Sequence, residues 1–214
     1  MTLAPSNIAE PSDNPEDSGR QRKRGAELEQ AIKDATIAEL TGGGYDGVTI
    51  ESVAARAQTG KASIYRRWPN KQDLVMDSLG CLLAGPLLSM STVELDESVT
   101  TRDALLALVR TVHALMAGEG GAAMRAIMAE SMRDPDFSTT VECGFFDPRV
   151  QALLALLERG VRRGEVRPDG VSGMVAEILA GTLIHRVIIR RQPIDDDELA
   201  ALIDDFIMPA IAPR

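Results

Sequence analysis

The side chains with the clearest chemical potential lie close together, between residues 49 and 71. Residues 61–67 combine ammonium, hydroxyl, phenol and guanidinium groups within seven positions. Lys and Arg bind phosphates and guanine edges, and hydroxyls reach either phosphates or bases. A single helix that carries such groups is thin enough to enter the major groove. The segment therefore predicts contact with double-stranded DNA.

Catalysis is the main alternative, and the sequence offers little for it. Its two histidines, His113 and His185, do not stand beside a plausible nucleophile. There is no Gly-x-Ser-x-Gly, dinucleotide-binding loop or metal-ligand spacing, and Cys81 and Cys143 are far apart. We therefore expect no enzyme activity, no cofactor, no metal and no disulfide.

The charge of the chain is unevenly distributed. The total is −9, yet residues 20–71 carry ten Lys and Arg against six Asp and Glu. Residues 72–214 carry thirteen basic and twenty-two acidic groups. A local positive patch suffices to bind phosphates, whereas a non-specific architectural DNA binder would be basic throughout. The pattern favours a basic head on an acidic body.

Apolar spacing predicts an all-α protein. Aromatic residues are only 3% of the chain, so Leu, Ile, Val, Met and Ala must fill the core. Residues 1–19 are polar and expected to be disordered. Nine helices follow from the periodicity, at about residues 26–41, 50–56, 61–67, 71–84, 102–117, 122–133, 147–163, 171–190 and 196–211. A loop is expected at 89–100. We divide the chain into a head, 20–70, and a body, 71–214.

The two short helices of the head must hold each other at a fixed angle. Thr49 can cap the first of them. Ile50, Val53 and Ile64 can pack together and onto the first long helix, and small residues at 54 and 57 allow a close crossing. This arrangement is a helix-turn-helix, with the second short helix facing outward.

The motif as a whole resembles the DNA-binding segment of TetR-family (TetR/AcrR) regulators. The shared pattern over residues 49–71 is Thr-x-x-x-Val-Ala-x-x-Ala-x-x-x-Lys-x-Ser-Ile-Tyr-x-x-Trp-Pro-Asn-Lys, and the similarity extends over about 26–80. A Gly-Glu-Val-Arg-Pro segment at 164–168 is also similar to many members. Two features depart from the pattern: Gln58-Thr59-Gly60 stands where members usually have Gly-Val-Ser, and Leu40 replaces a usual Phe.

The resemblance implies DNA-contacting roles for nine residues: Thr49, Ser52, Lys61, Ala62, Ser63, Tyr65, Arg66, Arg67 and Lys71. Lys61, Ala62 and Ser63 match base-reading positions, and Lys71 matches a phosphate anchor. The alternatives are a solvated face for Arg66 and Arg67 and a core position for Tyr65. The basic run at 20–24 is either a solubilising tail or an arm that reaches DNA.

The resemblance also implies an effector site and a dimer in the body. Apolar residues gather there that could line a pocket or simply fill the core: Leu105, Val109, Val112, His113, Met116, Met124, Met128, Phe145, Phe146 and Leu183. Residues of the last two helices are candidates for a homodimer interface: Ile178, Thr182, Leu199, Leu202 and Phe206. Two recognition helices are needed to read the half-sites of a palindrome.

The resulting hypothesis is a repressor released from a palindromic operator by a small apolar or amphipathic effector. An activator, or a regulator that ignores ligands, is the alternative. Residues 1–19 lack the features of a secretory signal, and the apolar helix at 171–190 is interrupted by charges and judged too short for a bilayer. We therefore expect a cytoplasmic protein.

Overall fold

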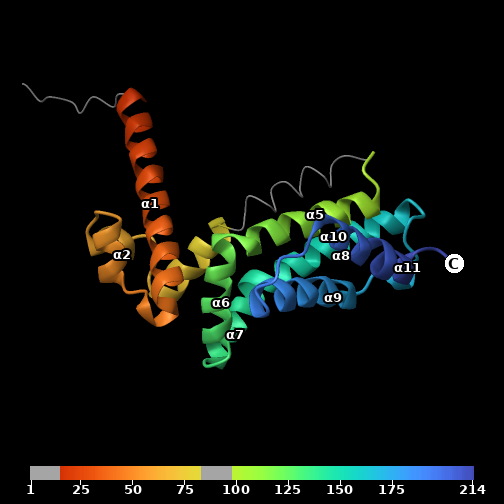
Figure 1. Cartoon of the computed structure of the whole chain (residues 1–214). Coiled ribbons are helices and arrows are strands. Elements are labelled where there is room, and N and C mark those ends of the chain that lie inside the picture. The colour runs from red at the N-terminus through yellow and green to blue at the C-terminus, as the bar shows by residue number, and fades with distance from the viewer. Residues whose placement is uncertain (1–14, 83–97) are drawn as a thin grey trace, which may run out of the picture.

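The computed structural model describes residues 15–82 and 98–214, which are helical with no β-strand among them (Figure 1). The all-α prediction and the nine helical stretches are confirmed for these residues. Figure 1 shows α1 and α2 at one end of the molecule and α8–α11 at the other, with α6 between them.

Four helices form the N-terminal part of the structure, residues 15–82, which we call the head from here on; residues 98–214 are the described part of the body. The four helices are α1 (Pro15–Gly47), α2 (Ile50–Arg56), α3 (Lys61–Tyr65) and an unlabelled helix over 71–82. The α1 helix is kinked at Gly44, which has φ 69° and ψ −174°, in the region that favours glycine. This kink redirects the chain toward α2.

The described part of the body contains seven α-helices. These are α5 (Thr101–Ala117), α6 (Glu119–Ser131), α7 (Pro135–Val141), α8 (Asp147–Arg162), α9 (Gly173–Leu183), α10 (Asp196–Ala201) and α11 (Met208–Ile211). A 3₁₀ turn, η2 (Pro168–Gly170), precedes α9. Three π-helical turns continue α7, α9 and α10: η1 (Glu142–Phe146), η3 (Ile184–Ile189) and η4 (Leu202–Ile207).

Several predicted boundaries are wrong. Residues 15–19, expected to be disordered, begin α1, where Pro15 takes the first helical position that proline favours. Residues 66–67 form a turn after the short α3. Residues 135–146, left unassigned, are helical because Pro135 follows the capping residue Asp134. Residues 1–14, 83–84 and 89–97 of the predicted segments lie outside the described residues.

Two hydrophobic clusters form the core. The first joins head residues such as Ile64, Trp68 and Leu74 to α6, α7 and η1, through Met124, Phe145 and their neighbours. The second joins α5, α8, α9, α10 and η4. The packing is continuous across residue 70, so the division into 20–70 and 71–214 stays a prediction.

The stretch Pro168–Ile189 is long and apolar enough, at a mean hydropathy of 1.4, to cross a membrane by length and composition. The expectation that it is too short is therefore wrong, since about 20 residues suffice. Within the fold, one side of this stretch packs into the second cluster through Val175, Leu179 and Leu183. The opposite side is not covered in the same way, since Met174, Ile178 and Ile189 are exposed.

Candidate nucleic-acid interface and apolar cavity

The N-terminus of α2 is closed by a reciprocal cap. Thr49 Oγ1 accepts a hydrogen bond from Ser52 N at 3.0 Å, and Ser52 Oγ accepts one from Thr49 N at 3.2 Å. Ile50, Val53 and Ala54 are buried and fix α2 against α1 and α3. The cap therefore places the two hydroxyl residues at one exposed corner of the head, although their hydroxyls already serve the helix.

The α3 helix has one buried anchor and an exposed face. Ile64 is fully buried, whereas Lys61, Ala62 and Arg66 are exposed. Tyr65 is 53% exposed, so it lies on the surface and not in the core. The sequence motif that suggested DNA contacts thus projects its polar side chains to solvent.

The cations on this face have only local partners among the described residues. Lys61 forms an ion pair with Glu51, and both side chains are more than half exposed. Arg66 Nη2 donates to Ser63 Oγ at 3.0 Å, and Arg67 Nη1 donates to Ser63 O at 2.9 Å. The hydrogen bond from Lys61 holds the pKa of Glu51 below its usual value. Exposed pairs of this kind are weak and easily exchanged for phosphate contacts.

Lys71 has a structural role that the sequence did not indicate. Its Nζ donates to the carbonyl oxygen of Tyr45 at 3.1 Å and lies 4.0 Å from the centroid of the Tyr45 ring. The ring in turn packs on Phe137 at a centroid distance of 4.5 Å. Lys71 therefore joins the start of helix 71–82 to the kinked end of α1. Burial raises the pKa of Tyr45 to about 12, so its phenol is neutral at pH 7.

The turn between α2 and α3 contains a strained residue. Gln58 has φ 51°, in the left-handed region, at the position where the motif usually has Gly. The capping residue of α3 is Gly60, which makes no side-chain cap. Gln58 and Gly60, which both depart from the family pattern in this turn, thus fall where backbone conformation and capping matter.

Trp68 is part of the head core. It is 5% exposed, and its Nε1 donates to Asp77 Oδ2 at 2.9 Å. Lys33 Nζ lies 3.0 Å from the same carboxylate oxygen, so Asp77 joins α1 to helix 71–82. Trp68 therefore packs between helices within the head.

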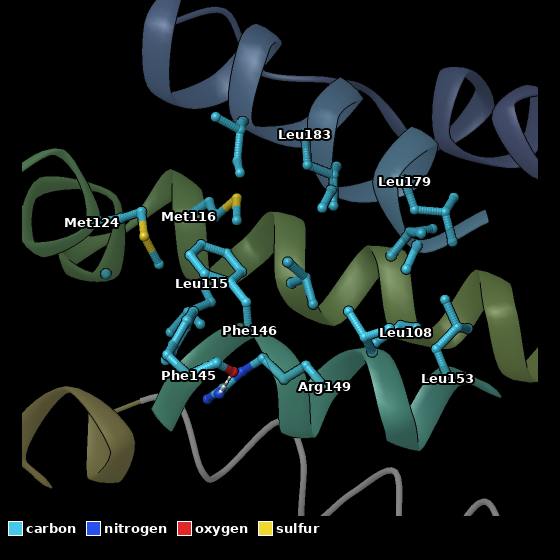
Figure 2. A pocket seen from close by; sticks show the side chains of 17 residues that line it. Leu108, Leu115, Met116, Met124, Phe145, Phe146, Arg149, Leu153, Leu179 and Leu183 are labelled. Atoms are coloured by element: carbon cyan, nitrogen blue, oxygen red, sulfur yellow. Dashed lines mark hydrogen bonds between the residues drawn. The ribbon is translucent and has the colours of Figure 1, made fainter. Parts of the chain in front are cut away.

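The body encloses an apolar cavity of about 140 Å³ between α5, α6, η1, α8 and α9. Figure 2 shows its side chains converging from these elements. Seven predicted residues line it: Val109, Val112, Met116, Met124, Phe145, Phe146 and Leu183.

Three other predicted pocket residues do not line this cavity. Leu105 is fully buried in the second hydrophobic cluster, and Met128 packs against the first. His113 Nε2 accepts a hydrogen bond from Ile194 N at 3.1 Å, so it holds the loop before α10. Side chains on one helical stripe can thus face different neighbours, which periodicity alone does not distinguish.

The sequence prediction missed several wall residues, above all Arg149. This side chain lies four residues after Phe145 and four before Leu153, which places all three on one helical face. The charge of Arg149 suggested a solvent-exposed position, although its spacing from Phe145 and Leu153 could have indicated that it faces the cavity. The other missed wall residues are Leu108, Leu115, Gly120, Val150, Leu153, Ala176, Leu179, Ala180 and Ile184.

The predicted interface residues divide into two groups. Leu199 is 3% exposed and packs in the second cluster, so its side chain is not available on the surface of the monomer for a dimer contact. Thr182 and Leu202 are partly buried, while Ile178 and Phe206 are 42% and 67% exposed. Met174 and Ile189, at 58% and 62%, extend the exposed apolar surface. We call Met174, Ile178, Ile189 and Phe206 the apolar face.

Chemical groups for catalysis do not gather in the part of the chain that the structure describes. No group of three or more His, Cys, Asp or Glu side chains there could hold a metal ion. Cys81 and Cys143 are free thiols. Asp134 is occupied as a helix cap, accepting hydrogen bonds from the backbone N of Asp136 and Phe137.

Comparison with known proteins agrees with this architecture. Residues 32–77 match the family described as bacterial regulatory proteins, tetR family, and residues 96–206 match the tetracyclin repressor-like C-terminal domain. An HTH-type transcriptional regulator of Mycobacterium tuberculosis is 33% identical over 177 residues, covering 82% of this chain and 84% of the relative.

Solved structures share the fold. FadR of Bacillus subtilis, in complex with stearoyl-CoA, has a TM-score of 0.65 and 17% identity, covering 85% of this chain and 96% of FadR. A transcriptional regulator of Saccharomonospora viridis, in complex with choline, has a TM-score of 0.64 and 19% identity, covering 88% and 100%. The helix-turn-helix head, the helical body and these matches together show that the chain belongs to the TetR family of transcriptional regulators, which bind DNA and are not enzymes.

Proposed function

We propose that this protein is a dimeric repressor that binds a palindromic operator through α3 and leaves it when a small molecule fills the cavity. One observation carries the proposal: Met124 and Phe145 line the cavity and also belong to the hydrophobic cluster that contains Ile64 of α3. A ligand that displaces these side chains would act on the packing that holds the recognition helix.

Polar contacts between head and body support the same coupling. Arg133, which follows α6, pairs with Asp46 at 2.8 Å, and Gln72 Nε2 donates to Thr140 Oγ1 of α7 at 2.5 Å. The hydrogen bond from Arg133 holds the pKa of Asp46 below its usual value. The α6 helix, which lines the cavity, and α7, which continues into the cavity-lining turn η1, therefore each have a polar contact with the head. A shift of α6 or α7 would move both contacts.

The exposed side of α3 supports base reading. Lys61, Ala62 and Ser63 lie in the first turn of that helix, where helix-turn-helix proteins contact base edges. Arg66, Arg67 and Lys71 follow at its other end as phosphate contacts. A monomer presents one such helix, so reading a palindrome needs a second copy.

The apolar face supports a homodimer. Two of its residues, Met174 and Ile178, lie one turn apart on α9, and Phe206 lies on η4. Large apolar side chains exposed together mark a protein contact more often than free surface. We assign this face to the contact between two bodies.

Ligand binding in related folds supports an effector. The B. subtilis FadR structure holds stearoyl-CoA, and the S. viridis structure holds choline. The cavity here is lined almost entirely by apolar side chains from several helices, as expected for a small-molecule site. π-helical turns, which are frequent at functional sites, supply Phe145, Phe146 and Ile184 of its wall.

The test compares two DNA duplexes by fluorescence anisotropy at one fixed salt concentration. One carries a palindrome from the region upstream of the protein's own coding sequence, and the other carries the same bases scrambled. We expect the palindrome to bind at least about 1,000-fold more tightly. Equal affinities would remove the operator reading. A compound that fills the cavity in a co-crystal and leaves operator affinity unchanged would contradict the ligand response.

A further inference from the structure

Arg149 is the one charged residue in the cavity wall, whose remaining members are all apolar or glycine. It extends from α8, and Figure 2 shows its guanidinium beside Phe145 at one edge of the lining. Nη1 donates to the carbonyl oxygen of Phe145, and Cζ lies 3.5 Å from the centroid of the Phe145 ring. The guanidinium is thus held flat against the aromatic wall.

This cation has no carboxylate partner within the described ranges 15–82 and 98–214. Its hydrogen bond goes to a neutral carbonyl, and its ring contact is to a phenyl group. Burial lowers the pKa of Arg149 to about 10, and the group stays charged at neutral pH. A partly buried charge without a counter-charge costs free energy, which an anion at the cavity would recover.

The wall contains no Asp or Glu. A cationic ligand would therefore find no counter-charge and would meet the positive field of Arg149. A neutral ligand would gain from the apolar surface alone. The planar guanidinium, with donors left after the bond to Phe145, matches the two oxygens of a carboxylate, which it can bind through paired hydrogen bonds.

The cavity also limits the size of the apolar part. Its volume of about 140 Å³ is close to that of an engineered apolar cavity that binds benzene. A short acyl chain or a single ring fits in such a space, whereas a long chain would need the walls to move.

We propose that the effector of this protein is a small amphipathic carboxylic acid, with its apolar part in the cavity and its carboxylate paired with Arg149. This inference rests on the proposed ligand response and specifies its chemistry. Arg149 donates a hydrogen bond to the carbonyl oxygen of Phe145. A carboxylate that draws the guanidinium away therefore acts directly on Phe145, which belongs to the first hydrophobic cluster together with Ile64 of α3.

The test titrates the full-length protein with straight-chain probes of four to ten carbons, using isothermal titration calorimetry. Each length is supplied as the carboxylate, the primary alcohol and the primary amine. At the best length we expect the carboxylate to bind about 10- to 100-fold more tightly than the alcohol, with the amine weakest. In Arg149→Gln this preference should vanish while alcohol affinity is kept. Arg162→Gln, at the end of the same helix, should keep the preference.

Equal affinity for carboxylate and alcohol, tighter binding of the amine, or no carboxylate binding at any length would overturn the inference. Operator release, followed by anisotropy with the same probes, separates the two proposals. If an alcohol releases DNA and the carboxylate does not, the effector chemistry proposed here is wrong and the ligand response stands. If a carboxylate binds through Arg149 and operator affinity is unchanged, the ligand response fails and the site assignment stands.

Discussion

At the scale of single residues, the helix-turn-helix segment follows the family pattern over residues 49–71 except in the turn at 58–60. The turn between α2 and α3 places Gln58 at φ 51°, a conformation that a side chain makes costly. Glycine takes this conformation without that steric cost. The turn is therefore formed at some expense of stability, compensated by the packing of Val53 and Ile64.

Gln58→Gly should stabilise the protein. Removing the side chain relieves steric strain, and the added flexibility of the unfolded chain offsets part of the gain, so we expect about 0.5–1 kcal/mol in the free energy of unfolding. Urea unfolding followed by circular dichroism measures it. Thr59→Gly, at ordinary φ in the same turn, should destabilise. If Gln58→Gly lowers stability as much as Thr59→Gly, the strain is absent.

Lys71 serves both the fold and, by our assignment, a phosphate. Lys71→Ala should weaken binding to the palindrome and to scrambled DNA alike and reduce the slope of log affinity against log salt by about 1. The lost hydrogen bond to Tyr45 should also cost about 1 kcal/mol of stability. Lys71→Arg should restore the slope, and Arg162→Ala, on the body, should not change it. An unchanged slope in Lys71→Ala would leave only the structural role.

At the scale of elements, arginine–carboxylate pairs join α5 and η3 to the last helices. Arg102 contacts both carboxylate oxygens of Asp204, at 2.6 and 2.7 Å. Arg110 pairs with Asp196 and Arg186 with Glu198. These hydrogen bonds hold the pKa values of Asp204, Asp196 and Glu198 below their usual range. The C-terminal helices are therefore attached by contacts that acid should weaken.

The pH dependence has a definite sign. Because the folded-state pKa of Asp204 is below its ordinary value of 3.8, its pair stabilises the protein above that value and is lost as pH falls further. Asp204→Asn should lower Tm only slightly at pH 7, because the pair is exposed, and its curve should converge with the wild type as the pH falls from 3.8 through the lower folded-state pKa of Asp204. Asp205→Asn, next to it and exposed, should follow the wild type throughout. Parallel curves at every pH would show that the pair does not titrate.

At the scale of the whole molecule, the dimer proposed above brings two heads to the DNA through the apolar face. Its four residues are between 42% and 67% exposed on the monomer. Three of them, Met174, Ile178 and Ile189, lie in Pro168–Ile189, which is long and apolar enough to cross a membrane by length and composition. A second copy of the chain is the partner that our proposed function requires for this surface.

Ile178→Asp should break that contact. A charge placed in an apolar interface remains without a partner, so we expect the dimer to weaken by at least about 30-fold, with operator affinity falling in parallel. Analytical ultracentrifugation measures the assembly. Met132→Asp is the control, since Met132 is 80% exposed but lies at the end of α6, outside the apolar face. A dimer unaffected by Ile178→Asp would place the interface elsewhere.

Some features of this protein were determined by sequence alone. Helix formation follows from local spacing and capping, so the nine helices and the pattern from Thr49 to Lys71 could be recognised without coordinates. Arg66 lies two residues after the buried Ile64, on the opposite side of the helix, so its exposure follows from local spacing. Local rules suffice there because each involves residues only a few positions apart.

Other features were decided only by the tertiary structure. The cavity wall collects residues from 108 to 184, and whether a side chain faces it depends on the angles between helices. Leu105 and Leu199 fit the apolar spacing, yet they pack inside the second cluster. Arg149 is charged, yet its side chain reaches the cavity wall. Spacing determines which side of a helix is apolar. Only the packing of several helices determines what that side meets, because the contacts join segments far apart in the chain.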